Sequence, residues 1–356
     1  MKIIIQKLDW KLLGAVFVLV AMGLLSLLST APHLFYKQLV WVGLSFFLSL
    51  FLMIADLRSF LGRKGFVFGL YWGMVILLIL TYFLAPQIKG NRAWIVFGGF
   101  QFQPSEIAKV ILIITLSYFL SRQHISIAYW RVFFSTIFYG VLPTLLIALQ
   151  PDLGSALIVA FLWLGFILIS GLPLKKVFFI SLAALLVFIL AWSYFLKDYQ
   201  RQRILGIFYP QRDPLGVNYN VIQSKIAIGS GGFLGKGFRQ GTQVQLGFLP
   251  EAQTDFIFAA LVEEGGMLAA IILFFAFGGM IFRILKIGLE SENNFYKFFS
   301  LGLAILFLTQ FTLHVGSNLG ILPVVGITLP FVSYGGSSIL ASFLLIGIIQ
   351  SAYIKR

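Results

Sequence analysis

The chain has 356 residues and a formal net charge of +14, and 60% of its residues are hydrophobic whereas 11% are charged. A soluble domain carries about 25% charged residues, so this composition excludes a water-soluble fold and predicts an integral membrane protein. The absence of cysteine excludes disulfide bonds, a thiolate nucleophile and a cysteine metal site.

Apolar stretches of bilayer-spanning or near-spanning length recur along the chain, and each must be helical in a membrane to satisfy its own backbone. They cover approximately residues 12–29, 38–55, 66–84, 105–120, 132–149, 155–170, 177–196, 256–281, 298–315 and 339–353. Residues 1–30 lack a small-residue cleavage site, so they are interpreted as a retained first span. We therefore expect an all-α polytopic membrane protein with about ten transmembrane helices in one membrane domain, residues 1–356.

Basic residues gather in the short loops of one side, which the positive-inside rule identifies as cytoplasmic. They are Lys2, Lys7, Lys11, Arg58, Arg63, Lys64, Arg122, Arg131, Lys175, Lys176, Arg283, Lys286, Lys297, Lys355 and Arg356. The opposite side then holds segments 30–37, 85–104, 150–154, 197–255 and 316–338, which contain most of the glycine, proline and polar residues. Both termini are expected in the cytoplasm. A large extracytoplasmic loop, about residues 197–255, lies between the seventh and eighth spans, and function is expected on its side.

This long outer loop is itself basic, with Lys197, Arg201, Arg203, Arg212, Lys225, Lys236 and Arg239. Long loops are translocated largely regardless of charge, so these residues do not contradict the orientation. They either hold anionic headgroups or phosphates or are solvated charges. Within the loop, Lys197–Pro214 mixes aromatic and aliphatic residues with arginines, a pattern typical of an amphipathic helix on the outer membrane surface.

Histidine is nearly absent, which argues against a histidine-based triad or metal cluster. His33 and His314 lie near outer helix ends, and His124 is on the inner side. Acid–base chemistry on the outer side must then use a carboxylate. The candidates are Glu106, Asp152, Asp198, Asp213, Glu251, Asp255, Glu263 and Glu264.

Asp255 lies where the polar loop turns directly into an apolar helix, in the sequence Pro250-Glu251-Ala252-Gln253-Thr254-Asp255-Phe256. A carboxylate at this partly dehydrated boundary can serve as a general base for a sugar hydroxyl. The alternative is that Thr254 or Asp255 only caps the helix.

The other carboxylates have simpler interpretations. Glu263 and Glu264 lie deeper in the apolar segment, where ionised groups are usually paired or functional, and a structural ion pair is favoured. Glu106 and Lys109 lie three apart on one helical face, so they either pair or leave Lys109 facing a phosphate. Asp152 is interpreted as a helix cap, with a cation ligand as the alternative.

A glycine-rich run from Ile228 to Gly237 resembles a nucleotide-binding P-loop only superficially. Ser230 stands where the first glycine of that motif belongs, and Gly237 stands where serine or threonine belongs. The run is therefore predicted to form a tight turn structure, with an anion-binding nest of backbone amides as the alternative.

Taken together, these segments resemble the SEDS family (shape, elongation, division and sporulation), over nearly the whole chain. The resemblance lies in Gly90-Asn91-Arg92-Ala93-Trp94, in Gln103-Pro104-Ser105-Glu106 with Lys109, in Gln150-Pro151-Asp152-Leu153-Gly154, in Asn218 through Gly237 to Gly241-Thr242-Gln243, in Phe248-Leu249-Pro250-Glu251, in Thr254-Asp255-Phe256-Ile257-Phe258, in Leu322-Pro323-Val324-Val325-Gly326 and in Leu329-Pro330-Phe331-Val332-Ser333-Tyr334-Gly335-Gly336-Ser337. The sequence of residues 224–237 is more similar to that of the RodA-like elongation branch of the family than to that of the division branch. Two residues depart from the family pattern, Gln253 in place of histidine and Gly265 in place of leucine.

The resemblance implies a peptidoglycan glycosyltransferase that polymerises lipid II into glycan strands at the outer face of the bacterial cytoplasmic membrane during elongation. It implies Asp255 as the base in an inverting transfer, with undecaprenyl pyrophosphate as leaving group. Arg92, Lys109, Lys225, Lys236 and Arg239 are the candidates for binding the pyrophosphate, and Glu106 and Asp152 lie in the same family motifs. Trp94 either stacks on a sugar or belongs to the interfacial aromatic belt.

The same resemblance implies Mg²⁺ or Mn²⁺ as candidate cofactors and a class B penicillin-binding protein, a transpeptidase, as partner. Lipid II, the growing lipid-linked glycan and the membrane complete the expected partners, and no nucleic acid is expected. Two alternatives remain open at this point. One is a lipid II flippase, which needs a polar pathway at the membrane midplane, and the other is a noncatalytic scaffold for the penicillin-binding protein.

Overall fold

The computed structural model describes residues 7–355 except 56, 89, 98–99, 124–128, 197, 210 and 212. His124, Lys197 and Arg212, which were considered above, lie outside the described residues.

The described chain is almost entirely helical, as expected. Its long helices are α2 (Trp10–Thr30), α3 (Pro32–Ile54), α5 (Lys64–Leu84), α6 (Pro104–Gln123), α7 (Trp130–Leu149), α8 (Leu153–Ile169), α9 (Leu174–Leu190), α13 (Ile257–Leu289), α14 (Asn294–Asn318) and α15 (Gly336–Ile354). By length and composition, nine segments of the described residues can cross a membrane, and α8 is a shorter apolar helix of 17 residues. This confirms the prediction of about ten membrane helices in an integral membrane protein.

Several helix starts follow from capping residues in the sequence. Asp9 and Asp152 accept hydrogen bonds from the Leu12 and Ser155 amides at the starts of α2 and α8, and Asn293 caps α14 in the same way. Pro32 begins α3, where its missing N–H has no helical partner to lose.

The polar segments contain more structure than the sequence predicted. A short antiparallel hairpin, β1 (Ile95–Phe97) and β2 (Phe100–Phe102), precedes α6, and α4 (Leu57–Leu61) lies between α3 and α5. The long loop begins after a π-helical turn, η2 (Ala191–Phe195), and contains α10 (Asp198–Phe208), α11 (Tyr219–Ser230) and α12 (Thr242–Gln245). The amphipathic helix expected within 197–214 corresponds to α10.

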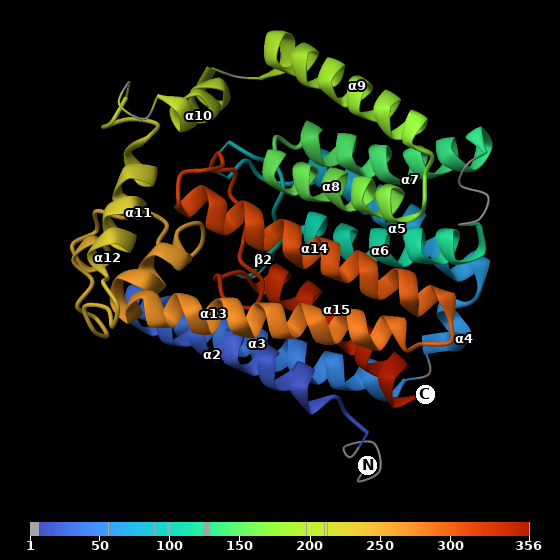
Figure 1. The fold of residues 1–356 in the computed structure, drawn as a ribbon, viewed down its shortest axis with the longest axis horizontal. Helices are drawn as coiled ribbons and strands as arrows, with labels where there is room; N and C mark the ends of the chain where they lie inside the picture. Colours follow the sequence, from blue (N-terminus) through green and yellow to red (C-terminus); the bar gives the residue numbers. More distant parts are fainter. Residues whose placement is uncertain are drawn as a thin grey trace.

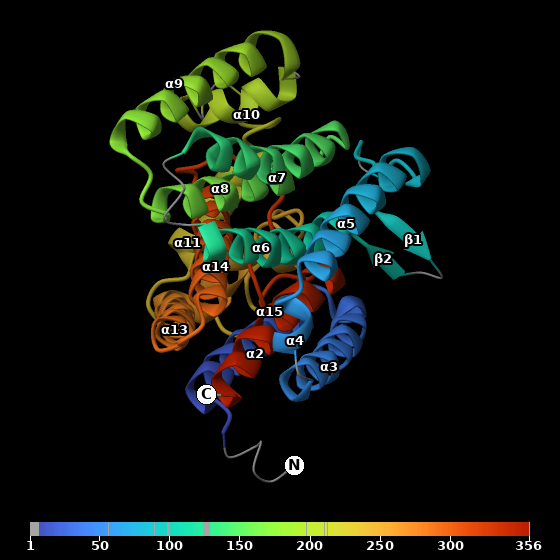
Figure 2. The same ribbon diagram turned by 90° about the vertical axis from the view of Figure 1, so that its right-hand side faces the viewer.

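The bundle has α6 and α15 in its interior, since most of each helix is buried, and α9 as its outermost helix (Figures 1 and 2). α15 packs against α3 and α6, α14 against α6 and α8, and α13 against α2 and α14. Burial of α6 is notable because this helix carries Glu106 and Lys109.

The two ends of the bundle are distinct. At one end, Lys355 donates to the carbonyl of Ala55, and Gln350 binds the backbone of Asp9. At the other end lie α10–α12 and the segment 319–335 that connects α14 to α15 (Figure 1). The hairpin contacts the start of α15, where the Ser337 hydroxyl donates to the Gln101 carbonyl. The candidate catalytic and substrate-binding residues predicted from the sequence lie in or next to the segments of this second end.

Candidate active site

Asp255 lies in a turn that is held directly before α13. Its side chain is half-buried, and its Oδ2 is 3.8 Å from the position that a Cβ on Gly326 would take. The N-cap of α13 is Phe256, and no side chain of that residue caps the helix. Thr254 instead donates to the carbonyl and carboxylate of Glu251. Thr254 therefore bonds to Glu251 rather than to the first amides of the helix, and the N-cap position belongs to Phe256.

The segment 319–335 packs onto this turn through its backbone and Ser333. The Tyr334 amide donates to the carbonyl of Gln253 at 2.9 Å, and the Ser333 hydroxyl donates to the carbonyl of Thr254 at 2.8 Å. Ser333 also accepts from the Leu329 amide. Because Gly326 belongs to the same segment, these bonds fix the turn and the surface facing the Asp255 carboxylate together.

The glycine-rich run inserts its backbone into a break in α13. At Gly266 the backbone leaves helical geometry, with φ 68° and ψ −168°. The amides of Lys236 and Gly237 donate to the carbonyls of Glu263 and Glu264, and the Met267 amide donates to the Gly232 carbonyl. The run forms a tight turn structure, as predicted, but its insertion into α13 was not predicted. The amides of Lys236 and Gly237 bond to this break in α13 rather than form an anion nest.

Both glutamates near the break anchor the long loop. Glu263 is fully buried and accepts from Lys236 Nζ at 2.8 Å and from the Gln243 and Val244 amides at the start of α12. Glu264 accepts from Gln245 Nε2 of α12 at 3.2 Å and from the Ser29 hydroxyl of α2 at 2.6 Å. This matches the interpretation of Glu263 as a member of a structural ion pair.

Glu106 and Lys109 form a buried ion pair of 2.7 Å in α6, and the Lys109 side chain is 1% exposed. Asp152 caps α8 and accepts from Gln103 Nε2 at 2.7 Å. The two simpler interpretations, an ion pair and a cap, therefore match the structure. A phosphate contact for Lys109 and substrate or cation contacts for Glu106 and Asp152 stay predictions.

The remaining cations differ in how firmly they are held. Arg92 is exposed, and its amide donates to the Gln150 carbonyl, while Trp94 nearby is half-buried. Lys225 is exposed on α11 and packs over Gly320 of the segment 319–335. Arg239 is exposed and donates to the Leu28 carbonyl.

A second cation, Arg203 of α10, lies near Lys225. Together they line a small depression with Val324, whose carbonyl accepts from Arg203 Nη1 at 3.1 Å. Two cations from separate helices thus border the segment that carries Gly326.

A metal site made by the protein alone is not found within the described residues, where no three histidine or acidic side chains gather. The carboxylate of Asp152, the candidate cation ligand, accepts hydrogen bonds from the Ser155 amide, Gln103 Nε2 and the Ser105 hydroxyl. Binding of Mg²⁺ or Mn²⁺ together with the phosphates of a substrate stays a prediction.

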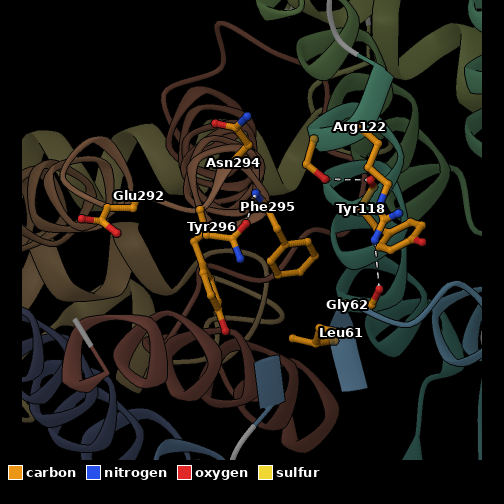
Figure 3. Close-up of a pocket in the computed structure, with 10 residues that line it drawn as sticks. Leu61, Gly62, Tyr118, Arg122, Glu292, Asn294, Phe295 and Tyr296 are labelled. Carbon is orange, nitrogen blue, oxygen red and sulfur yellow. Dashed lines mark hydrogen bonds between the residues drawn. The ribbon is translucent and has the colours of Figure 1, made fainter. Parts of the chain in front are cut away.

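A pocket of about 370 Å³ lies at the opposite end of the bundle, between α4, the end of α6 and the start of α14 (Figure 3). Arg122 stacks over Tyr118 there and donates to the Gly62 carbonyl. This pocket shares no residue with the region around Asp255.

Three residues around Asp255 were not selected as site residues from the sequence: Gly326, Ser333 and Asn318. Gly326 and Ser333 were noticed only as parts of motifs. Asn318, fully buried, donates to the Asp255 carbonyl. The sequence feature that could have identified Asn318 is its position as a single asparagine near the end of an apolar span, because buried amides in membranes need hydrogen-bond partners.

Comparisons with known proteins agree with this architecture. A family model described as "Cell cycle protein", for FtsW, RodA and SpoVE, matches residues 1–356. The peptidoglycan glycosyltransferase MrdB of Escherichia coli K12 is 40% identical over 303 residues, which cover 82% of this chain and 79% of MrdB.

Solved structures show the same fold. A chain from a study of how a peptidoglycan synthase complex coordinates polymerization and crosslinking is 34% identical, with a TM-score of 0.82 and 97% of both chains covered. The rod shape determining protein RodA of Thermus thermophilus is 28% identical, with a TM-score of 0.72, 98% of this chain and 97% of RodA covered.

Proposed function

The chain belongs to the FtsW/RodA/SpoVE family, and on that premise we propose that it is a RodA-like peptidoglycan glycosyltransferase that polymerises lipid II into glycan strands. The observation that carries the proposal is the position of Asp255. Its carboxylate lies at the junction of the long loop and α13, beside Gly326, in a turn whose backbone is bound by the segment 319–335.

In the proposed reaction the 4-hydroxyl of the acceptor GlcNAc attacks the anomeric carbon of the lipid-linked chain. A carbon–oxygen bond forms to the acceptor, and the bond to the pyrophosphate breaks, so the linkage inverts from α to β. Asp255 accepts the hydroxyl proton, and undecaprenyl pyrophosphate leaves with the bonding electrons. A single displacement needs one base, and a pyrophosphate leaving group needs cations more than a strong acid.

Four of the other outer carboxylates make structural contacts. Glu106 pairs with Lys109, Asp152 caps α8, and Glu263 and Glu264 anchor the long loop. Asp255 is assigned as the base by its position directly before α13, at the end of the long loop, and by its motif.

Exposed cations at the same end are proposed to bind the pyrophosphate. Arg92 and Lys225 are the first candidates, because both are exposed, and Lys225 of α11 packs over Gly320 of the segment that carries Gly326. Arg239 and Lys236 are secondary candidates, since each already bonds to the protein. Charge-assisted bonds to phosphate are worth about 1.5–3 kcal/mol each, so losing one is expected to slow turnover roughly tenfold or more.

The proposal places the Asp255 end outside the cytoplasmic membrane and both termini inside. A class B penicillin-binding protein is the proposed partner, supported by the similarity to a chain of a peptidoglycan synthase complex. A flippase would need polar groups within the membrane, and Glu263 and Glu264 are the carboxylates that lie deepest in the apolar segment. Their contacts with the long loop account for both residues without a transport pathway.

The test is polymerisation of labelled lipid II by the purified protein in proteoliposomes, alone and with a class B penicillin-binding protein blocked by penicillin. Glycan strands are expected, and the blocked partner cannot crosslink them. Movement of lipid II across the bilayer without polymer would support the flippase, and no product under either condition would support the scaffold.

A further inference from the structure

Asn318, the last residue of α14, is a fully buried amide that bridges two helices. Its Nδ2 donates to the carbonyls of Asp255 and His314, both at 2.8 Å. Its Oδ1 accepts from the Ala259 amide at 3.1 Å. Because carbonyls only accept and an amide N–H only donates, these neighbours fix which way the side-chain amide points.

The Ala259 amide belongs to the first turn of α13, where helical N–H groups have no partner within their own helix. The N-cap of this helix is Phe256, which supplies no side-chain oxygen. Asn318 therefore caps α13 from a different helix, 59 residues along the chain. The same side chain binds the carbonyl of Asp255, so the backbone is held on both sides of the junction.

Asn318 is also connected to the helix that carries a proposed phosphate ligand. Its own carbonyl accepts from the Ser224 hydroxyl at 2.8 Å, and Ser224 is followed in α11 by Lys225. The segment 319–335 donates to the carbonyls of Gln253 and Thr254, and Asn318 donates to the following carbonyl, that of Asp255. One residue thus joins the turn that carries the base to the helix that carries the cation.

We infer that Asn318 is a positioning residue that sets the Asp255 carboxylate relative to α11. The inference rests on the proposed function, in which Asp255 is the base. It goes further because it assigns a role in catalysis to a side chain that touches neither substrate nor the reacting atoms. Misplacing a catalytic group by about 1 Å can cost on the order of 100-fold in rate, so a lost tether at Asp255 is expected to be measurable.

The experiment compares Asn318→Ala and Asn318→Asp with wild type in the lipid II assay, measuring kcat, KM and thermal unfolding. Asn318→Asp keeps an acceptor for the Ala259 amide but has at most one O–H, so it cannot donate to the carbonyls of both Asp255 and His314. Both variants are expected to lower kcat about tenfold or more while KM for lipid II changes less than about twofold, because ground-state binding is not the function that is lost.

Gln350 provides a matched control at the other end of the bundle. It is a fully buried amide that accepts from the Asp9 amide and donates to the Asp9 carbonyl, at the start of α2. Gln350→Ala is expected to lower the unfolding temperature to an extent similar to Asn318→Ala, with kcat of the folded protein unchanged.

A double variant separates positioning from general destabilisation. If Asn318 acts through Asp255, adding Asn318→Ala to Asp255→Asn slows the residual reaction no further, whereas independent effects multiply. The inference would be overturned by a wild-type kcat in Asn318→Asp, or by effects that multiply in the double variant. If the alanine variant does not fold, the kcat of Asn318→Asp serves as the test. Wild-type rate in Asp255→Asn would instead contradict the base assignment itself, so the two failures are distinguishable.

Discussion

Gly326 leaves open the space beside the Asp255 carboxylate: a Cβ at position 326 would have only Oδ2 of Asp255, at 3.8 Å, within 4 Å. Gly326→Ala is expected to slow polymerisation, because the methyl group would occupy space that the acceptor hydroxyl needs next to the base. Steady-state rates with lipid II measure the effect.

Gly326 also has φ 70°, so alanine there is strained as well as bulky. Gly171→Ala is the matched control, since Gly171 has φ 76° and no heavy atom within 4 Å of a Cβ. Both variants should lose a similar part of their stability, and only Gly326→Ala should lose rate. Equal rates in the two variants would show that the space beside Asp255 is not used.

The buried pair of Glu106 and Lys109 predicts a large stability effect. Lys109→Met leaves the Glu106 carboxylate enclosed without its partner, and breaking a buried pair costs about 3–5 kcal/mol. The double variant Glu106→Gln/Lys109→Met should recover much of that loss, because neither charge remains buried. Thermal unfolding in detergent is the measurement.

The control is the pair Lys286 and Glu290 in α13, at 3.8 Å, with side chains 47% and 41% exposed. Lys286→Met should change the free energy of unfolding by less than about 1 kcal/mol, as is usual for exposed pairs. If Lys109→Met is equally mild, the pair is not structural, and a phosphate-binding role for Lys109 regains weight.

The insertion of the glycine-rich run into α13 predicts sensitivity at Gly235. This glycine has φ 81°, and a Cβ there would collide with the Glu264 carbonyl oxygen. Gly235→Ala should separate the run from the break in α13 and increase hydrogen exchange of the Lys236 and Gly237 amides. The control is Gly278→Ala in α13, where a Cβ would have open space around it, and this variant should leave hydrogen exchange of the two amides unchanged. Equal exchange of these amides in both variants would contradict the insertion.

The orientation can be tested with single cysteines, since the chain has none of its own. Leu215 is 86% exposed in the long loop, and Tyr129 is 71% exposed before α7. Leu215→Cys should react with a membrane-impermeant maleimide in intact cells, and Tyr129→Cys only after lysis. The reverse pattern would invert the orientation.

The spans and the paired residues were predictable because they depend on local rules. Apolar length sets the membrane helices, a spacing of three places Glu106 beside Lys109, and an aspartate at the start of α8 caps it. The prediction of a carboxylate at the boundary of loop and helix also placed Asp255 where the structure has it.

What the sequence did not provide are contacts between distant segments. At the break at Gly266, the run around Gly235 supplies hydrogen bonds to the backbone groups of α13, and the apolar pattern of α13 gives no sign of the break. The cap on α13 comes from Asn318, although capping is usually sought in adjacent residues. The hairpin at 95–102 was missed because strands of three residues leave almost no alternation to detect.

The most direct test of the account is the polymerisation rate of Asp255→Asn, with Asp213→Asn, an exposed carboxylate of the same loop, as control. Asparagine keeps the shape of aspartate but cannot take the hydroxyl proton, and loss of a general base costs on the order of 10² to 10⁴ in rate. The account predicts a loss of that size for Asp255→Asn with normal thermal stability, and wild-type rate for Asp213→Asn. A stable Asp255→Asn protein that builds glycan from lipid II at nearly the wild-type rate would contradict it.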